Sequence, residues 1–125
     1  LRRKRYRIRA IRKRRELSPV ADRTRAIRPG DVLVLSCFRN EGVRLPWFLS
    51  YYRRLGVGHF LMVDNGSDDG GRELLAGEPD VSLWTTGASY RRSRYGVDWL
   101  NGLAMRHGVG HWCLTVDPDE LFVYP

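Results

Sequence analysis

The chain has 125 residues, of which 42% are hydrophobic and 29% are charged. This length is typical of a single domain, and the hydrophobic content excludes wholesale disorder because it is enough to fill a packed core. The formal net charge of +8 is unevenly distributed: residues 1–28 carry 13 Lys and Arg against 2 Asp and Glu, whereas residues 29–125 carry 9 against 12, so a basic character is excluded for the larger part.

Residues 1–28 are predicted to form a basic N-terminal arm, followed by an α/β domain at residues 29–125. The apolar positions of the arm are irregular, and Ser18-Pro19 is expected to end any helix that forms there. One interpretation is a solvated, partly helical arm. The other is contact with a membrane surface or with nucleic acid, because arginine-rich segments bind lipid headgroups and phosphates equally well. The composition of the arm leaves these alternatives open.

Apolar runs and helical periodicities alternate along the rest of the chain. Strands are predicted at 31–38, 59–65, 81–86 and 111–117, and helices at 43–55, about 67–75 and about 95–107. Ser67 or Asp68 is expected to cap the second of these helices. The alternation predicts an α/β fold with a mostly parallel β-sheet flanked by helices. The last strand is expected at or near an open edge of the sheet, which favours a homo-oligomer or a swapped dimer.

The cysteines, histidines and tryptophans are interpreted as structural residues. Cys37 and Cys113 lie in apolar runs, so we expect two reduced thiols in the core of a cytoplasmic protein. The histidines show no metal-ligand spacing. Core packing is expected for Trp47, Trp84, Trp99 and Trp112. No stretch approaches the ~20 apolar residues that a membrane-spanning helix needs, and the sequence shows no secretory signal.

Polar clusters follow three of the predicted strands. Ligands of parallel α/β sheets bind beyond the carboxyl ends of the strands, so these clusters should meet at one edge. In the last cluster, Asp117-Pro118-Asp119-Glu120, two carboxylates can share a small volume, where they repel each other unless a cation is present or one is protonated. Such oxygen ligands suit Mg²⁺ or Mn²⁺. An acidic turn is the alternative, but at the end of a buried strand we favour the metal.

The other clusters each have a structural alternative. Phe38 could stack on a flat ring and Asn40 could hydrogen-bond a base edge, or the segment is a turn with Glu41 placed favourably at the start of a helix. Asp64 could accept a hydrogen bond from a base or a ribose, although Asn-Gly and Asp-Gly are common turn dipeptides. Three arginines after the third strand could neutralise a diphosphate or form a solvated face: Arg91, Arg92 and Arg94.

Taken in order, these clusters resemble the family 2 glycosyltransferases with the GT-A fold, over about residues 31–125. The resemblance is carried by Phe38-Arg39-Asn40-Glu41, Asp64-Asn65-Gly66-Ser67-Asp68-Asp69 and Asp117-Pro118-Asp119, with Asn101 matching a further Asn before the last motif. The extension by Glu120 is similar to a bacterial branch linked to cell-surface polysaccharide. The resemblance implies that the chain is the nucleotide-sugar-binding half of a GT-A, Rossmann-like fold.

The resemblance also implies an activity, namely metal-dependent transfer of a sugar from a nucleotide-sugar donor to an acceptor. Asp119, together with Asp117, would bind a divalent metal, Mn²⁺ or Mg²⁺, that bridges the two phosphates, and Glu120 would support the metal or orient a neighbour. The residues expected to bind the donor are Phe38, Asn40, Glu41, Asp64, Asn65, Arg94 and Asp117.

The sequence departs from the family pattern in two places. Asn65 stands where many members have Asp, which affects the contacts to the base. Leu100 stands where many have Arg, so the charge of the phosphates would be neutralised by Arg91, Arg92 or Arg94, or from elsewhere in the protein. The acceptor half and its general base are expected beyond Pro125, so this chain is interpreted as the donor-binding part of a larger enzyme.

Other functions stay open at this point. The enzyme is expected in the cytoplasm or peripherally at the inner face of the membrane, reached through the basic arm. The alternatives are a non-catalytic module that uses the arm on membrane or nucleic acid, and a nucleotidyltransferase with the same metal chemistry. A Rossmann-type oxidoreductase is disfavoured because the first strand is not followed by Gly-x-Gly-x-x-Gly.

Overall fold

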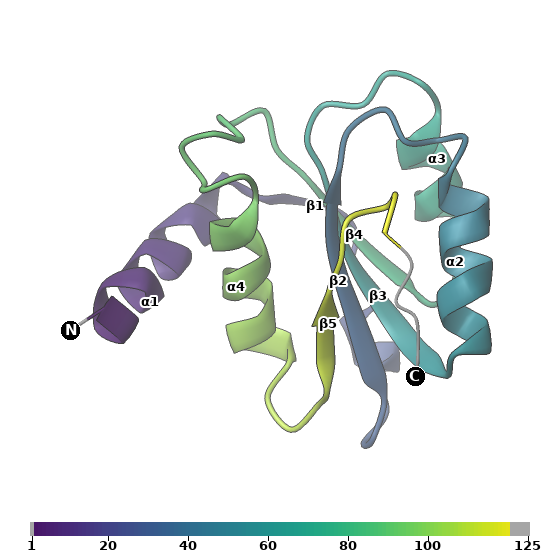
Figure 1. The fold of residues 1–125 in the computed structure, drawn as a ribbon, viewed down its shortest axis with the longest axis horizontal. Coiled ribbons are helices and arrows are strands. Elements are labelled where there is room, and N and C mark those ends of the chain that lie inside the picture. The colour runs from purple at the N-terminus through teal and green to yellow at the C-terminus, as the bar shows by residue number, and fades with distance from the viewer. Residues whose placement is uncertain (1, 121–125) are drawn as a thin grey trace.

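The computed structural model describes residues 2–120, apart from the side chains of Arg2, Arg3 and Arg14. Its main elements alternate between helices and strands (Figure 1). In chain order they are α1 (Arg2–Lys13), β1 (Ser18–Ala21), β2 (Val32–Phe38), α2 (Leu45–Arg54), β3 (Val57–Asp64), α3 (Gly71–Ala76), β4 (Val81–Thr85), α4 (Val97–His107) and β5 (Cys113–Thr115), with short 3₁₀ helices at Arg14–Glu16 and Thr24–Ala26.

The strands form one five-stranded sheet in the order β1-β4-β3-β2-β5. Four strands run parallel, and β1 pairs antiparallel with β4. The α/β fold with a mostly parallel sheet is therefore confirmed. The last strand lies at an edge, as expected, but it comprises Cys113–Thr115 rather than the seven or so residues predicted. No helix among the described residues is both long and apolar enough to cross a lipid bilayer.

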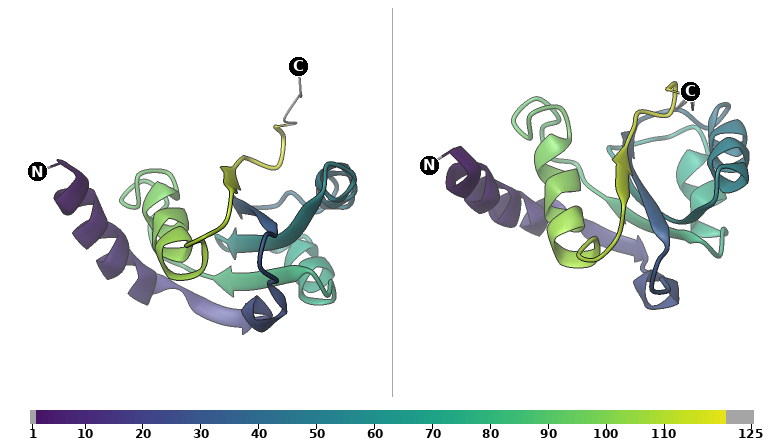
Figure 2. Two further views of the ribbon diagram at one scale, coloured as in Figure 1. Left: turned by 90° about the horizontal axis from the view of Figure 1, so that it is seen from below. Right: turned by 60° about the horizontal axis from the view of Figure 1, so that its bottom comes forward.

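The helices lie in layers on both faces of the sheet (Figures 1 and 2). Because successive side chains of a strand point to opposite faces, β2 contributes to two separate cores. Val34 and Phe38 pack with α2 and α3, whereas Leu33 and Leu35 pack with α4. Strand β2, which lies between β3 and the edge strand β5, is thus buried on both sides, and its carboxyl end lies next to those of β3 and β5.

The N-terminal segment packs against the rest of the chain. Helix α1 lies outside α4, with Ala10 fully buried and Arg9 Nε 2.8 Å from Asp98 Oδ2. The helix ends before Ser18-Pro19, as predicted, but residues 18–21 then form β1, a strand that the sequence analysis did not predict. Pro19 is tolerated there because β1 is an edge strand, which can lack one backbone donor.

Two tryptophan predictions are wrong, and two are confirmed. Trp84 and Trp99 are buried, but Trp47 and Trp112 are 76% and 84% exposed. Trp47 lies on the outer face of α2, since the inner face is already formed by other apolar side chains at helical spacing. Trp112 precedes the edge strand β5, where no described element covers it.

Two smaller predictions also need correction. Cys37 is a buried free thiol as expected, whereas the free thiol Cys113 is exposed because β5 is an uncovered edge strand. Neither Ser67 nor Asp68 caps α3. The N-cap is Gly70, in the left-handed conformation at φ 89°, which has no side chain to cap the helix. Asp69 Oδ1 instead accepts a hydrogen bond from the backbone N–H of Gly71, the first residue of α3, at 3.0 Å. Ser67 Oγ is used elsewhere, in a hydrogen bond from the loop after β2.

Candidate functional site

Hydrogen bonds join the loop after β2 to the loop after β3, at the carboxyl end of the sheet. The Asn40 backbone N–H donates to Ser67 Oγ, and the Asp68 backbone N–H donates to Asn40 Oδ1, each at 2.9 Å. The Gly42 N–H donates to Asp69 Oδ2, also at 2.9 Å. Asn40 adopts φ 54°, a left-handed conformation that Asn tolerates better than most residues. The polar residues of the two motifs therefore hold their loops together as one unit.

Asp64 lies at the base of this unit and is completely buried. Arg72 Nε donates to its Oδ2 at 2.6 Å, and the Ser67 backbone N–H donates to its Oδ1 at 2.8 Å. Both carboxylate oxygens are thus used within the protein. Asp64 was expected to contact a donor, but it is not among the residues that line the pocket described next.

An open pocket of about 320 Å³ lies at the carboxyl edge of the sheet, a volume at the lower end for small-molecule sites. It is where the three polar clusters meet, as the parallel strand order predicted. The residues that line it are Cys37, Phe38, Arg39, Glu41, Asn65, Tyr90, Asp117, Pro118 and Asp119.

The acidic segment after β5 forms a turn over residues 117–120. The Glu120 N–H donates to the Asp117 carbonyl at 2.9 Å, and the Tyr52 hydroxyl of α2 donates to the Glu120 carbonyl at 3.0 Å. Carboxylate oxygens of Asp117, Asp119 and Glu120 all lie within 4.8 Å of one another, in solvent-exposed positions. We call these three residues the acidic triad. The turn and the metal-ligand interpretations are thus compatible, since the turn is what gathers the carboxylates.

The acidic triad fits a hard divalent cation. A hydrogen bond to Asp117 and the charges of Asp117 and Asp119 raise the pKa of Glu120, as expected for carboxylates crowded without enough positive charge. Within the described part of the chain, Arg44 is the cation paired with this group, at 3.9 Å from Nη1 to Asp119 Oδ2. Arg44 is also shared with Glu41, at 3.4 Å. Oxygen ligands with excess negative charge are the type that Mg²⁺ and Mn²⁺ use.

Cys37 and Tyr90 contribute uncharged groups to the lining of the pocket. Burial, with smaller contributions from the charges of Asp117 and Asp64, raises the pKa of Cys37 to about 12. The thiol is therefore protonated near neutral pH and is a poor nucleophile. Burial also raises the pKa of Tyr90, so its phenol stays neutral. The sequence analysis did not identify Tyr90; its one signal was an aromatic residue within the polar loop after β4.

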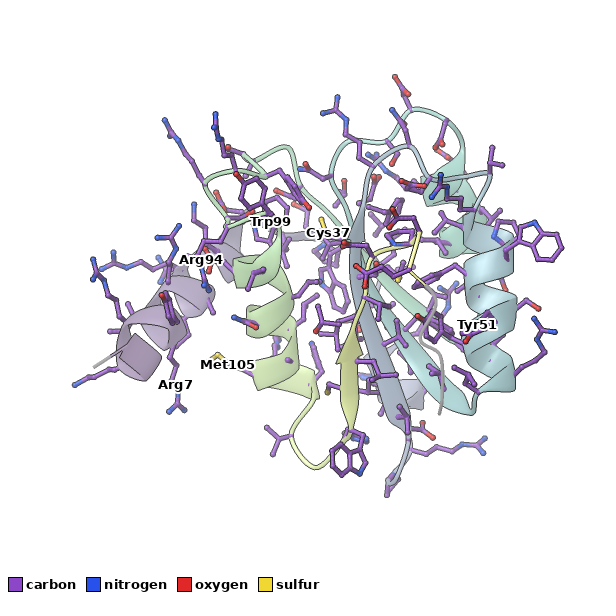
Figure 3. All side chains as sticks on the ribbon, viewed as in Figure 1. Arg7, Cys37, Tyr51, Arg94, Trp99 and Met105 are labelled. Carbon is purple, nitrogen blue, oxygen red and sulfur yellow. The ribbon has the colours of Figure 1, made fainter. Side chains whose placement is uncertain are left out.

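Arg94 does not reach the pocket. Its Nε donates to Asp98 Oδ1 at 2.7 Å, and its guanidinium lies 4.3 Å from the centre of the Tyr6 ring. Figure 3 shows Arg94 beside α1, with α4 between it and much of the sheet. Asn101 lies in a groove between α1 and α4, also away from the pocket.

The arginine at the pocket is instead Arg39, which the sequence analysis placed in a motif but gave no role. Arg91 and Arg92 are exposed on the loop before α4 and are not among the lining residues. Of the residues expected to bind the donor, the structure brings Phe38, Glu41, Asn65 and Asp117 to the pocket, together with Asp119. Asn40 supports the pocket through its loop.

Comparisons with protein-family models, with curated proteins and with solved structures find no match for this chain. A function must therefore be argued from the residues of the pocket and from the acidic triad beside it.

Proposed function

We propose that this chain binds a nucleotide-sugar donor together with a divalent metal, as the donor-binding part of a glycosyltransferase. One observation carries the proposal: the three polar clusters converge on one pocket, with the acidic triad at its side. A nucleoside diphosphate has a flat ring, a ribose and two charged phosphates. The pocket offers a different chemistry for each of these parts.

The base would lie against the Tyr90 ring, which is 40% exposed. Phe38 also lines the pocket, but it is only 3% exposed because it packs in the core with α2 and α3, so it offers little surface for the stacking expected from the sequence. Asn65 Nδ2 donates to the carbonyls of Thr86 and Ala88, at 3.3 and 3.2 Å, which fixes the orientation of the amide. Its Oδ1 accepts no hydrogen bond from the described residues and so presents an acceptor. An acceptor at this place suits a base with a ring N–H, such as uracil or guanine.

The diphosphate would lie on the charged side of the pocket. Asp117 and Asp119 would hold the metal, and Glu120 would complete the oxygen set. When bound, the metal would neutralise negative charge that develops on the departing diphosphate. Arg39 adds a protein cation to the lining of the pocket. Asp64, Asn40 and Arg72 would act indirectly, because they fix the loops that carry the pocket residues.

Calorimetric titration with UDP and with GDP, each with and without Mn²⁺, tests the proposal. We expect one nucleotide to bind in a Mn²⁺-dependent manner, and Asp119→Asn to weaken that binding by at least ~100-fold, since even the residues behind metal ligands contribute 10–100-fold. Asp68→Asn is the matched control, because Asp68 is an exposed carboxylate at the same sheet edge but outside the acidic triad.

Two results would contradict the proposal. One is the absence of binding of either nucleotide in the presence of Mn²⁺ by the folded chain. The other is nucleotide binding that is equally strong without the metal and in Asp119→Asn, which would show that the acidic triad takes no part in it.

A further inference from the structure

The cationic side chains that the structure describes in α1 fall into two groups. Arg9 and Lys13 form ion pairs inside the protein, with Asp98 at 2.8 Å and with Glu16 at 3.5 Å. The other group is exposed and forms no ion pair with any described residue: Lys4, Arg5, Arg7 and Arg12. Docking of α1 on α4 therefore neutralises part of its charge and leaves the remainder in solvent.

Apolar side chains lie among these unpaired cations. Ile8 and Ile11 are 46% and 41% exposed. Residues four apart lie on the same face of a helix, so Lys4, Ile8 and Arg12 follow one another along the outer face of α1. Beside this face runs a groove of about 650 Å³ between α1 and α4, which Ile11 and Met105 help to line.

The position of α1 makes this face accessible. Helix α1 forms the outermost layer of the molecule, beyond α4 and on the far side from α2 and α3 (Figures 1 and 2). Arg7 of α1 and Met105 of α4 are labelled in Figure 3 at the groove between the two helices. A flat partner could thus contact α1 and the groove without meeting the sheet.

We propose that the outer face of α1 docks on an anionic lipid bilayer, with Ile8 and Ile11 entering the headgroup region. Unpaired cations beside exposed apolar side chains are the pattern of a helix that lies in the membrane interface. A nucleic-acid backbone would pair with the same cations but would gain nothing from the exposed isoleucines, Ile8 on the outer face and Ile11 at the groove beside it. The inference rests on α1 alone and is independent of the proposed nucleotide site.

Flotation of the chain with lipid vesicles tests this inference. We expect binding to vesicles of phosphatidylcholine and phosphatidylglycerol in equal parts, and none to pure phosphatidylcholine. Each cation at the surface contributes roughly a factor of five, so Arg5→Gln with Arg12→Gln should weaken binding by about 25-fold. Ile8→Ser, which leaves the charge unchanged, should weaken binding roughly tenfold.

The matched control is Arg25→Gln with Arg28→Gln. Both arginines are exposed and lie outside α1, and replacing them lowers the net charge of the protein by the same amount as the α1 double variant. The inference is overturned if this control weakens vesicle binding as much as the α1 pair does, or if anionic vesicles do not bind. Fluorescence anisotropy with a DNA duplex gives a further criterion. Duplex binding that is tighter than vesicle binding and insensitive to Ile8→Ser would assign the face to nucleic acid instead.

Discussion

Charged residues lie at both ends of the parallel sheet, but the two ends use them differently. At the amino end, Arg53 donates from Nε and Nη2 to the two carboxylate oxygens of Asp80, at 2.8 and 2.6 Å, and also reaches Glu78 at 3.0 Å. Burial raises the pKa of Asp80, but the hydrogen bond and the charge of Arg53, with smaller contributions, together outweigh this and hold the pKa below its usual value. These charges are satisfied within the protein.

At the carboxyl end, the one ion pair of the acidic triad among the described residues joins Arg44 to Asp119, at 3.9 Å. The comparison shows that the presence of charged residues does not by itself mark a site in this fold. A charge that is paired within the protein supports the structure, whereas like charges with little pairing are candidates for a ligand site. Asp64 is the carboxyl-end residue that follows the amino-end pattern, because Arg72 pairs with it.

The largest effect on stability is expected for Arg72→Ala, which tests whether Asp64 is a structural charge although it lies at the carboxyl end of the sheet. Removing Arg72 leaves a fully buried carboxylate without its ion partner. We expect the free energy of unfolding to fall by about 3 kcal/mol, at the lower end for a broken buried pair, because Asp64 is fully buried while the Arg72 side chain is 36% exposed. Urea denaturation measures it, with Arg54→Ala as the control because Arg54 is exposed. A loss no larger than that of the control would mean that Asp64 is not held by this pair.

A smaller loss is expected for Gly96→Ala, which tests how tightly the pocket wall is built. Gly96 has φ +84°, and a Cβ there would lie 3.0 Å from Cys37 Cβ and 3.3 Å from the Tyr90 ring. We expect a loss of about 2 kcal/mol. The loss has two causes, the positive φ and the crowding of the added Cβ. Gly30→Ala isolates the first, because its φ is +86° and no atom lies within 4 Å of a Cβ there, and it should cost about 1 kcal/mol. Equal losses in the two variants would show that Cys37 and Tyr90 move aside for the added methyl group at no cost in stability.

The amino end should produce a pH dependence through His59. This histidine is buried against Ser82, at 2.8 Å from Nε2 to Oγ, and burial lowers its pKa. The unfolded chain therefore takes up a proton near pH 6.5 that the folded protein does not. Stability should fall as the pH drops below about 6.5, with a slope of at most about 1.4 kcal/mol per pH unit. His59→Gln should show a smaller slope in denaturation series across pH 5 to 7, and an unchanged slope would assign the effect elsewhere.

The smallest effect on stability is expected for Asp119→Asn. Asp119 is exposed and supports no described element, so its replacement should change the free energy of unfolding by no more than about 0.5 kcal/mol. Thermal denaturation of the parent protein and of Asp119→Asn, each with and without Mn²⁺, measures how much the metal stabilises each of them. The parent protein should be stabilised by the metal and the variant should not. A large loss of stability in the absence of metal would place this carboxylate with the structural charges of the amino end.

Much of the architecture was determined by the sequence itself. Alternating apolar runs and helical periodicities located every strand from residue 32 onward, since burial of a strand or a helix face leaves a local pattern. The parallel order then implied that the polar segments at residues 38–41, 64–69 and 117–120 would meet, and they do. Whether the meeting point binds a nucleotide sugar and a metal stays a prediction.

Only the tertiary structure decided which partner each polar side chain takes. Asp64 and Asp119 both follow strands in acidic motifs, yet one is buried against Arg72 and the other is exposed beside the pocket. Arg94 and Arg39 both precede helices, yet Asp98 and Tyr6 hold the first away from the pocket that the second lines. The pattern of apolar residues in a strand depends on burial and can be read from a few consecutive residues. The choice between a ligand and an ion pair depends on residues brought together from distant parts of the chain, and local sequence does not record it.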